Sequence, residues 1–481
     1  MAKLFRPVYL FPISLVLAWL FDHFFWDKAV GVSFPIFTLL LIAAGLWMAR
    51  RSRLKLARES LWLILLIVLL SLVSVSRAEP FTLLTSRVLA VFLLGLLALS
   101  FLGGRWVSYG FADHIVNLLG LIPRGLGLLR SSGETQARKR GKRSLIGSLA
   151  PVARGVLFVL PLLFFLAVLL SSADPYFAEW LGDLFFGLEN APEYLLRGLI
   201  ILGLAYCLAA AYIYALVRSK DRTLLAHGKP VIAPLLGFGE AATMLTSVNL
   251  LFALFVVVQF RYFFCGFANI VDSPGGLTYA EYARRGFFEL VVVAITALIF
   301  FVLLSGLARR QKSRQQAWFT GLGIGLFLLV AVILASAFQR LLLLEQAYGF
   351  TRLRTYPHVF MIWLGLLLLA IVTLEALGRR RAFALAVLLA VVGFTLTLPL
   401  LNVDAFITRI NLQRNTLAGE LDHLYLASLS DDAVPELVGA YQQAAETGQV
   451  ELSDQLAVAL TCHFGQAAPE SALPWQSWNS S

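Results

Sequence analysis

Charged residues are scarce in this chain of 481 residues. Asp, Glu, Lys and Arg together make up only 14% of it, whereas soluble domains carry about 25%. Hydrophobic residues reach 59%, and the mean hydropathy is +0.81. This composition excludes an ordinary soluble domain and indicates a protein that is embedded in a membrane.

Cysteine, histidine and the common catalytic motifs are also sparse. The chain has three cysteines and six histidines without the spacing of metal ligands, and it has no P-loop, no HExxH and no G-x-S-x-G motif. The sequence therefore predicts neither a metal nor a cofactor. Gly321 and Gly325 lie within an apolar run, so they fit close helix packing better than a phosphate loop. Cys265 and Cys462 both fall on the predicted outer side, where a disulfide between them is an open alternative.

Apolar runs long enough to cross a bilayer recur along most of the chain. We count about eleven, because a span needs about 20 residues. They lie within Val8–Phe25, Gly31–Met48, Leu61–Val75, Phe81–Leu102, Ala150–Ser171, Leu199–Leu216, Ala241–Phe260, Gly286–Gly306, Ala317–Phe338, Val359–Leu377 and Ala382–Leu401. The sequence predicts an all-α, polytopic integral membrane protein with about eleven transmembrane helices and a small extracytoplasmic helical tail.

The distribution of basic residues predicts the orientation. Most of the 39 Lys and Arg residues fall in loops on one side, including Arg50–Arg58, Arg138–Arg143 and Arg379–Arg381. Positive loops stay in the cytoplasm, so we expect a cytoplasmic N-terminus and a C-terminus outside the cytoplasm. The positive charge then predicts contact with anionic lipid at the cytoplasmic loops and no binding of nucleic acid.

The order of the runs divides the chain into four parts. Residues 1–103 would form four transmembrane helices, 104–149 a cytoplasmic amphipathic and basic segment, and 150–401 a core of seven helices. Residues 402–481 would form an acidic helical tail outside the cytoplasm. In the tail, Pro435 and Gly448 predict the ends of one helix, and Ser453 predicts the start of a second.

The most informative stretch is Thr278–Glu289, where charged residues precede an apolar run. Thr278 and Glu281 fit a capping box. Glu281, Arg285 and Glu289 are spaced i, i+4 and i+8, which places them on one helix face beside Tyr282 and Arg284. Charge at membrane depth is costly. The stripe is either a self-neutralising ladder that anchors its helix or a substrate or proton site.

Other polar residues fall on the same predicted side. Arg261 ends one apolar run, while Arg340, Glu345 and Arg354 flank the loop after another. If they approach the stripe, they form an outward-facing polar chamber. Asn249 lies in the middle of an apolar run and predicts a hydrogen bond between helices.

Several of these segments resemble a bacterial membrane family, the domain of unknown function 4173, with the 4153 family as relatives. The resemblance rests on Ser172–Ala178, Leu245–Gln259, Leu277–Leu290, Arg340–Arg354, Asn402–Ile407 and Asn411. It covers roughly Ala150–Arg414 and is most specific in the Tyr-Ala-Glu-Tyr-Ala-Arg stretch. The resemblance implies a multi-pass protein of the bacterial inner membrane and supplies no activity or catalytic residue.

Three functions remain open. The first is a transporter-like protein that uses Glu281, Arg285 and Glu289 in a polar path. The second is a membrane scaffold or regulator whose tail binds an envelope protein, or a second copy of the chain. The third is an enzyme that modifies an envelope glycan or lipid, for which Asp22 and Asp27 offer carboxylates on a short outer turn. A non-enzymatic role is favoured.

Overall fold

A computed structural model describes residues 9–140, 170, 174, 176, 191–219, 235–264, 287–310, 312–418, 421–466 and 474–478. The described residues are helical, apart from turns and an isolated β-bridge between Leu236 and Ala308. The predicted all-α class is thus confirmed.

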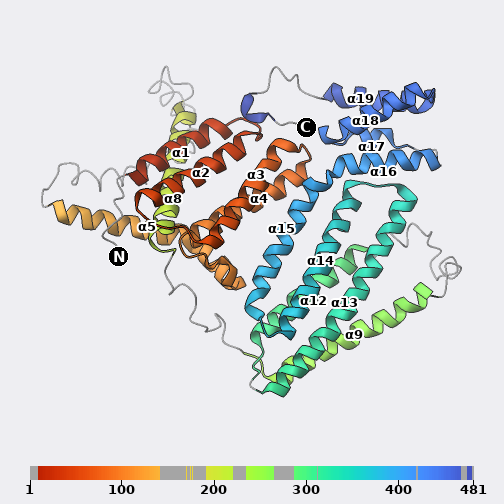
Figure 1. Ribbon diagram of the computed structural model, residues 1–481, viewed down its shortest axis with the longest axis horizontal. Coiled ribbons are helices and arrows are strands. Elements are labelled where there is room, and N and C mark those ends of the chain that lie inside the picture. Colours follow the sequence, from red (N-terminus) through yellow and green to blue (C-terminus); the bar gives the residue numbers. More distant parts are fainter. Residues whose placement is uncertain are drawn as a thin grey trace. The chain divides into compact units, whose positions relative to one another are not determined.

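The described residues form α-helices and four short 3-10 helices, η2, η4, η5 and η7 (Figure 1). Their bounds are α1 Leu10–Phe25, α2 Ser33–Arg51, α3 Arg58–Ser76, α4 Pro80–Ser100, η2 Arg105–Ser108, α5 Phe111–Arg140, α8 Ala191–Val217, α9 Phe238–Phe264, α12 Phe287–Leu307, α13 Ser313–Tyr348, α14 Arg352–Ala376, η4 Arg380–Ala382, α15 Phe383–Leu401, α16 Val403–Ala418, α17 His423–Ala427, η5 Asp431–Ala433, α18 Val434–Glu446, α19 Val450–Gln466 and η7 Trp475–Ser477.

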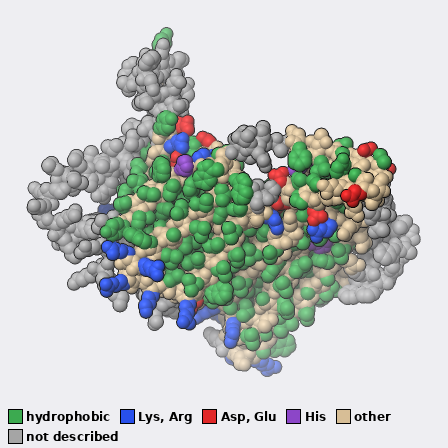
Figure 2. Space-filling model, turned by 45° about the horizontal axis from the view of Figure 1, so that its top comes forward, with side chains coloured by type: hydrophobic (Ala, Val, Ile, Leu, Met, Phe, Trp, Pro, Cys, Tyr) green, Lys and Arg blue, Asp and Glu red, His purple; other side chains and the backbone are tan. Residues whose placement is uncertain are grey.

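Within the described ranges, nine helices are long and apolar enough to cross a membrane. They are α2, α3, α4, α8, α9 and α12 to α15. Helix α1 is apolar but has only 16 residues, about one residue short of the usual span. The predicted run Ala150–Ser171 lies almost entirely outside the described residues, so eleven crossings stay a prediction. On the face drawn in Figure 2, hydrophobic side chains cover most of the helical surface, as suits contact with lipid.

The chain forms two compact units, which we describe separately. Unit 1 comprises Met1–Ile64, Leu94–Gly104 and Val116–Asp221, and unit 2 comprises Leu65–Leu93, Arg105–Ile115 and Arg222–Ser481. In unit 1, α1 packs against α8 and α2. Arg197 of α8 binds Asp22 of α1 through two hydrogen bonds of 3.1 and 2.8 Å.

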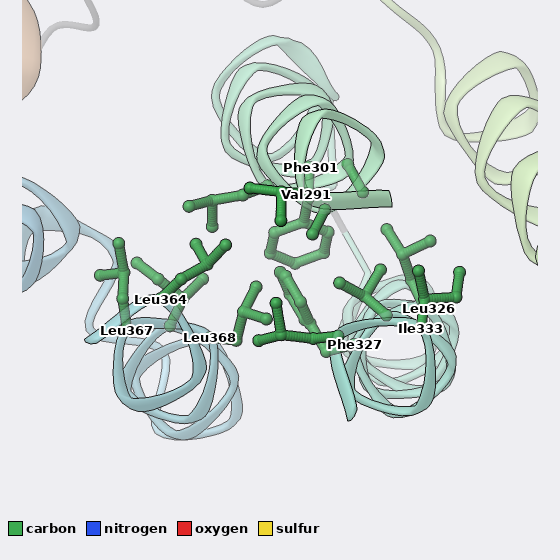
Figure 3. Close-up of a cluster of buried hydrophobic side chains, with 14 of the residues drawn as sticks. Val291, Phe301, Leu326, Phe327, Ile333, Leu364, Leu367 and Leu368 are labelled. Carbon is green, nitrogen blue, oxygen red and sulfur yellow. The ribbon is translucent and has the colours of Figure 1, made fainter. Parts of the chain in front are cut away.

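The core of unit 2 is an apolar seam between α12, α13 and α14 (Figure 3). Phe301 of α12 is fully buried and meets Phe327 of α13 edge to face, with 4.8 Å between ring centroids. Leu364 and Leu368 of α14 close the third side. Aromatic pairs of this kind add about 0.5–1.5 kcal/mol beyond the area they bury.

A small residue in α13 makes this close approach possible. A Cβ on Gly323 would lie 2.4 Å from the Phe301 ring, whereas a Cβ on Gly321 would meet nothing within 4 Å. The predicted role in close packing is therefore wrong for Gly321. It is confirmed for Gly325, where a Cβ would lie 3.3 Å from Asn249 Oδ1 of α9, and Gly323 makes the closest approach. The prediction for Asn249 is confirmed, because its side chain donates a 3.1 Å hydrogen bond from α9 to the Leu322 carbonyl of α13.

The tail of unit 2 is a helical appendage, α16 to α19. Asn402 has a left-handed conformation (φ 50°) and separates α15 from α16. Helix α16 then crosses the end of α14 where Arg352 lies (Figure 1). Gly448 follows α18 as predicted, but α19 begins at Val450, three residues before the predicted cap Ser453. The Ser453 hydroxyl instead donates to the Val450 carbonyl within the first turn.

The segment after the fourth span also differs from its prediction. Within residues 104–149 the sequence predicts an interfacial amphipathic helix followed by a disordered basic loop, Ser131–Arg143, but α5 continues as one helix through Arg140. Glu, Gln, Ala, Arg and Lys dominate its last turns, and these residues favour helix. Basic residues therefore extend the helix here rather than end it.

Candidate functional site

Buried polar side chains gather where α13 ends and α14 begins. The turn between these helices, Gly349–Thr351, lies beside the appendage, and the Phe350 N–H donates a 2.8 Å hydrogen bond to Asn411 of α16. The turn before α4 reaches the same region, because Glu79 accepts a hydrogen bond from the Tyr356 hydroxyl of α14. We call this region the polar end of unit 2.

Asp404 is the most deeply buried carboxylate of the polar end and is fully saturated with donors. It is 0% exposed. Arg352 Nε donates to its Oδ1 at 2.8 Å, and the Ser430 N–H and hydroxyl donate to its Oδ2 at 2.8 and 2.6 Å. Arg352 Nη2 also donates to Oδ2 at 2.5 Å, and a planar guanidinium pairs well with a carboxylate in this two-point geometry. The Asp404 cluster therefore fixes α16 and the segment before α18 to the start of α14.

Asp432 and Glu79 form a second saturated cluster. Asp432 Oδ2 accepts from the N–H groups of Ala78 and Glu79 at 3.0 and 3.1 Å. The Glu79 carboxylate accepts in turn from the N–H groups of Phe81 and Thr82, at the first turn of α4. Burial raises the pKa of Asp432, although the two N–H donors oppose this shift. Carboxylates with this many donors serve to dock elements together.

The pair formed by Glu345 of α13 and His358 of α14 differs from these clusters. Glu345 is 1% exposed, and its Oε1 lies 2.9 Å from His358 Nδ1. Within the described part of the chain, Glu345 Oε2 and His358 Nε2 are buried without a hydrogen-bond partner. The hydroxyl of Thr355, one turn before His358 on α14, is likewise buried without a hydrogen-bond partner among the described residues. An unsatisfied buried carboxylate costs free energy, so the pair requires an explanation that packing does not give.

Two other predicted members of the chamber have structural partners. Arg340 of α13 donates a 3.2 Å hydrogen bond to Gln259 of α9. Arg354 donates to the carbonyls of Tyr348 and Gly349 and lies over the Tyr348 ring, 5.6 Å from its centroid. Arginine at a helix C-terminus binds the last carbonyls in this way. Arg354 thus caps α13.

The structure places Glu289 in the first turn of α12, where it is exposed. A carboxylate there suits the positive end of the helix dipole. Glu281, Tyr282, Arg284, Arg285 and the side chain of Arg261 lie outside the described residues, so the charged stripe stays a prediction. So does the Cys265–Cys462 disulfide: Cys462 is exposed on α19, and Cys265 lies outside the described ranges.

A further polar cluster, which the sequence did not predict, lies at the opposite ends of α13 and α14. Glu375 binds Arg310 Nη1 at 2.7 Å, and both side chains are 2% exposed. Arg380, Gln316 and Ser305 also contact Glu375. Burial lowers the pKa of Arg310 to about 10, so the guanidinium stays charged at neutral pH. The position of Glu375 at the end of an apolar run, just before three arginines, was the available signal.

The described residues offer little to the alternatives with catalytic chemistry. Among these residues, no group of three or more His, Cys, Asp or Glu side chains could hold a metal ion, which leaves the metal-independent chemistries open. Asp22, the carboxylate considered for an envelope enzyme, forms an ion pair with Arg197 at 2.8 Å. This pairing gives Asp22 a structural role within unit 1.

Comparison with known proteins gives a family and no activity. No curated protein and no solved structure matches the chain. The relationship to the 4173 family stays a prediction, whereas the model of the 4153 family matches the chain. This model matches a longer stretch than the resemblance covered, and this stretch includes Glu79, Glu345, His358, Asp404 and Asp432. Because the model described as Domain of unknown function (DUF4153) matches residues 24–440, the chain belongs to that family.

Proposed function

We propose that this integral membrane protein is a proton-coupled transporter in which the Glu345–His358 pair binds and releases the proton. The observation that carries the proposal is the difference between Glu345 and the other buried carboxylates of the polar end. Asp404, Asp432 and Glu79 each have several donors, as docking requires. Glu345 is equally buried, and among the described residues the hydrogen-bond partner of its side chain is His358, while Arg354 acts on it through charge alone.

The chemistry of the pair suits this role. Histidine is the side chain that ordinarily changes charge between pH 5 and 8. His358 Nδ1 lies 2.9 Å from the Glu345 carboxylate, so a proton bound at either residue is within hydrogen-bond reach of the other. Ionisable groups inside membrane helices mark proton relays and substrate paths. The pair joins α13 to α14, so a change in its charge would act directly on the contact between two spans.

Proton-coupled transport can be tested in inverted membrane vesicles that contain the protein. A pH gradient is imposed and followed with a fluorescent amine, and pools of amino acids, sugars and phosphorylated metabolites are added in turn. We expect at least one pool to dissipate the gradient. Glu345→Gln and His358→Gln should reduce this rate to that of vesicles without the protein, whereas Glu446→Gln, on an exposed residue of α18, should not.

Each other outcome contradicts the proposal. If no pool dissipates the gradient, the protein is not a proton-coupled transporter of these substrates. If Glu345→Gln leaves the rate unchanged and Glu289→Gln abolishes it, the proton site belongs to the charged stripe predicted from the sequence. Hydrogen exchange of α13 and α14 in each variant establishes that the fold is retained.

A second candidate, a membrane scaffold, is favoured by how firmly the appendage is held. Asp404 and Asp432 fix it to α14 and to the turn before α4, while Tyr441 and Trp475 remain partly exposed. A rigidly held extramembrane surface suits a protein partner. Photocrosslinking from positions 441 and 475 should recover one specific envelope protein, or a second copy of this chain, if this function is correct.

A further inference from the structure

We infer that the loop between α14 and α15 binds the phosphate of an anionic ligand, in the first instance the head group of an anionic phospholipid. The loop carries three consecutive arginines, Arg379–Arg381, and borders a cavity of about 630 Å³. Residues 107–108 of η2 line its other wall. This inference does not depend on the proposed transport activity.

The backbone holds the arginines at the cavity. Gly378 has φ +68°, which ends α14, and the Arg379 N–H donates back to the Leu374 carbonyl. This left-handed turn is a common helix end that reverses the chain. The following residues form η4 directly before α15. Two helix ends therefore fix the loop.

The charge balance of the loop leaves two cations for a ligand. Glu375 is the nearby carboxylate, and it is already bound by Arg310 and Arg380. Arg379 and Arg381 are exposed, and no carboxylate among the described residues lies within 4 Å of their charged groups. Guanidinium groups bind phosphate oxygens in pairs. The cavity thus combines uncompensated positive charge with space for a phosphate group.

The apolar residues around the cavity favour a lipid as the source of the phosphate. Val107, which lines the cavity, is 39% exposed, and Leu377, which directly precedes the lining residue Gly378, is 62% exposed. Exposed apolar side chains beside arginines form the arrangement expected at a membrane interface. A soluble phosphorylated molecule would bind the arginines through its phosphate, but it has no acyl chain to contact these apolar side chains.

The test compares lipid and free phosphate as probes. The purified protein is placed in nanodiscs of phosphatidylcholine with a minor fraction of phosphatidylglycerol, and retained lipid is measured by native mass spectrometry. We expect Arg379→Gln/Arg381→Gln to lower retained phosphatidylglycerol on the order of tenfold. Arg50→Gln/Arg51→Gln removes the same charge from the exposed end of α2 and should leave retention close to that of the wild type.

A second variant separates a site from general surface charge. Ala382→Leu keeps every arginine but narrows the cavity that Ala382 lines, so it should also lower retention. Equal retention in the wild type and Ala382→Leu, or equal losses in the two double variants, would overturn the lipid head group as the ligand, and the absence of saturable phosphate binding as well would overturn the whole inference. In phosphatidylcholine nanodiscs, inorganic phosphate is titrated by calorimetry. Saturable binding of phosphate that Arg379→Gln/Arg381→Gln removes, without selective retention of phosphatidylglycerol, would support the arginine site with a soluble phosphate as its source.

Discussion

Asp432 of the appendage accepts a 3.1 Å hydrogen bond from the N–H of Glu79, which lies 353 positions earlier in the chain. The bond connects the turn before α4 with the start of α18, and both ends belong to unit 2. Glu79 in turn caps α4 and binds Tyr356 of α14. One short chain of contacts within unit 2 therefore links the turn before α4, helix α14 and the appendage.

Asp432→Ala should loosen the appendage. The substitution leaves the N–H groups of Ala78 and Glu79 without their acceptor, and each unsatisfied group costs about 1–3 kcal/mol. We expect faster hydrogen exchange throughout α18 and a lower midpoint of thermal unfolding in detergent. The matched control is Glu446→Ala on the exposed end of α18, which should change neither. Similar exchange rates in both variants would show that Asp432 does not hold the appendage.

The docking of α18 should also depend on pH, because burial raises the pKa of Asp432. A carboxyl whose folded pKa exceeds its unfolded value of about 3.9 favours the folded state most below that value. This contribution is lost as the pH rises through the folded pKa. The stability advantage of the wild type over Asp432→Asn should thus shrink from about pH 4 toward neutrality, by at most about 1.4 kcal/mol per pH unit. Thermal unfolding of both proteins across this range measures it, and an advantage that grows with pH would contradict it.

Glu375→Leu should destabilise unit 2 strongly. Glu375 and Arg310 are both 2% exposed, and breaking a buried ion pair from one side costs about 3–5 kcal/mol. Replacing both partners with apolar residues is often neutral, so Glu375→Leu/Arg310→Met should recover much of the loss. Chemical denaturation in detergent provides the comparison. If the double variant is less stable than Glu375→Leu, Arg310 contributes more through its position over the Phe319 ring, 3.8 Å from the centroid, than through the ion pair.

Two glycines of α13 provide a matched pair for testing the core. Gly323→Ala places a methyl group 2.4 Å from the buried Phe301 ring, and overpacking of this kind costs about 1–3 kcal/mol. Gly321→Ala meets nothing within 4 Å and should gain up to about 1 kcal/mol of helix propensity. Thermal unfolding should therefore shift in opposite directions. A shift in the same direction for both would mean that the α12–α13 contact adjusts freely.

The membrane helices could be predicted from the sequence because a span needs only length and apolar composition. Ten of the predicted runs correspond to helices of the structure, from α1 to α15. Helix ends were less predictable where several neighbouring residues could each begin the helix. Helix α19, for example, begins at Val450 and not after the predicted cap Ser453. The extent of α5 was missed because its basic residues favour both a loop and a helix.

The candidate site was predicted in part. Glu345 and Arg340 were identified by their charge beside an apolar run, but His358 was set aside because no second metal ligand is spaced near it. Its partner is Glu345, which lies 13 positions earlier, on the other side of the turn that joins α13 to α14. Contacts of this kind depend on how α13 and α14 pack against each other. The spacing of residues along the sequence does not determine that packing. The Asp432 contacts span 353 and 354 positions and have no local signal at all.

The length of α13 has a consequence for where the polar end lies. Its 36 residues extend about 54 Å, and even at a tilt of about 40° they rise about 41 Å through a hydrocarbon core of about 30 Å. The helix therefore must project into the headgroups or the water beyond. If both ends of α13 project, the Glu345–His358 pair lies near the boundary of the hydrocarbon core, and the appendage that follows lies at the headgroups.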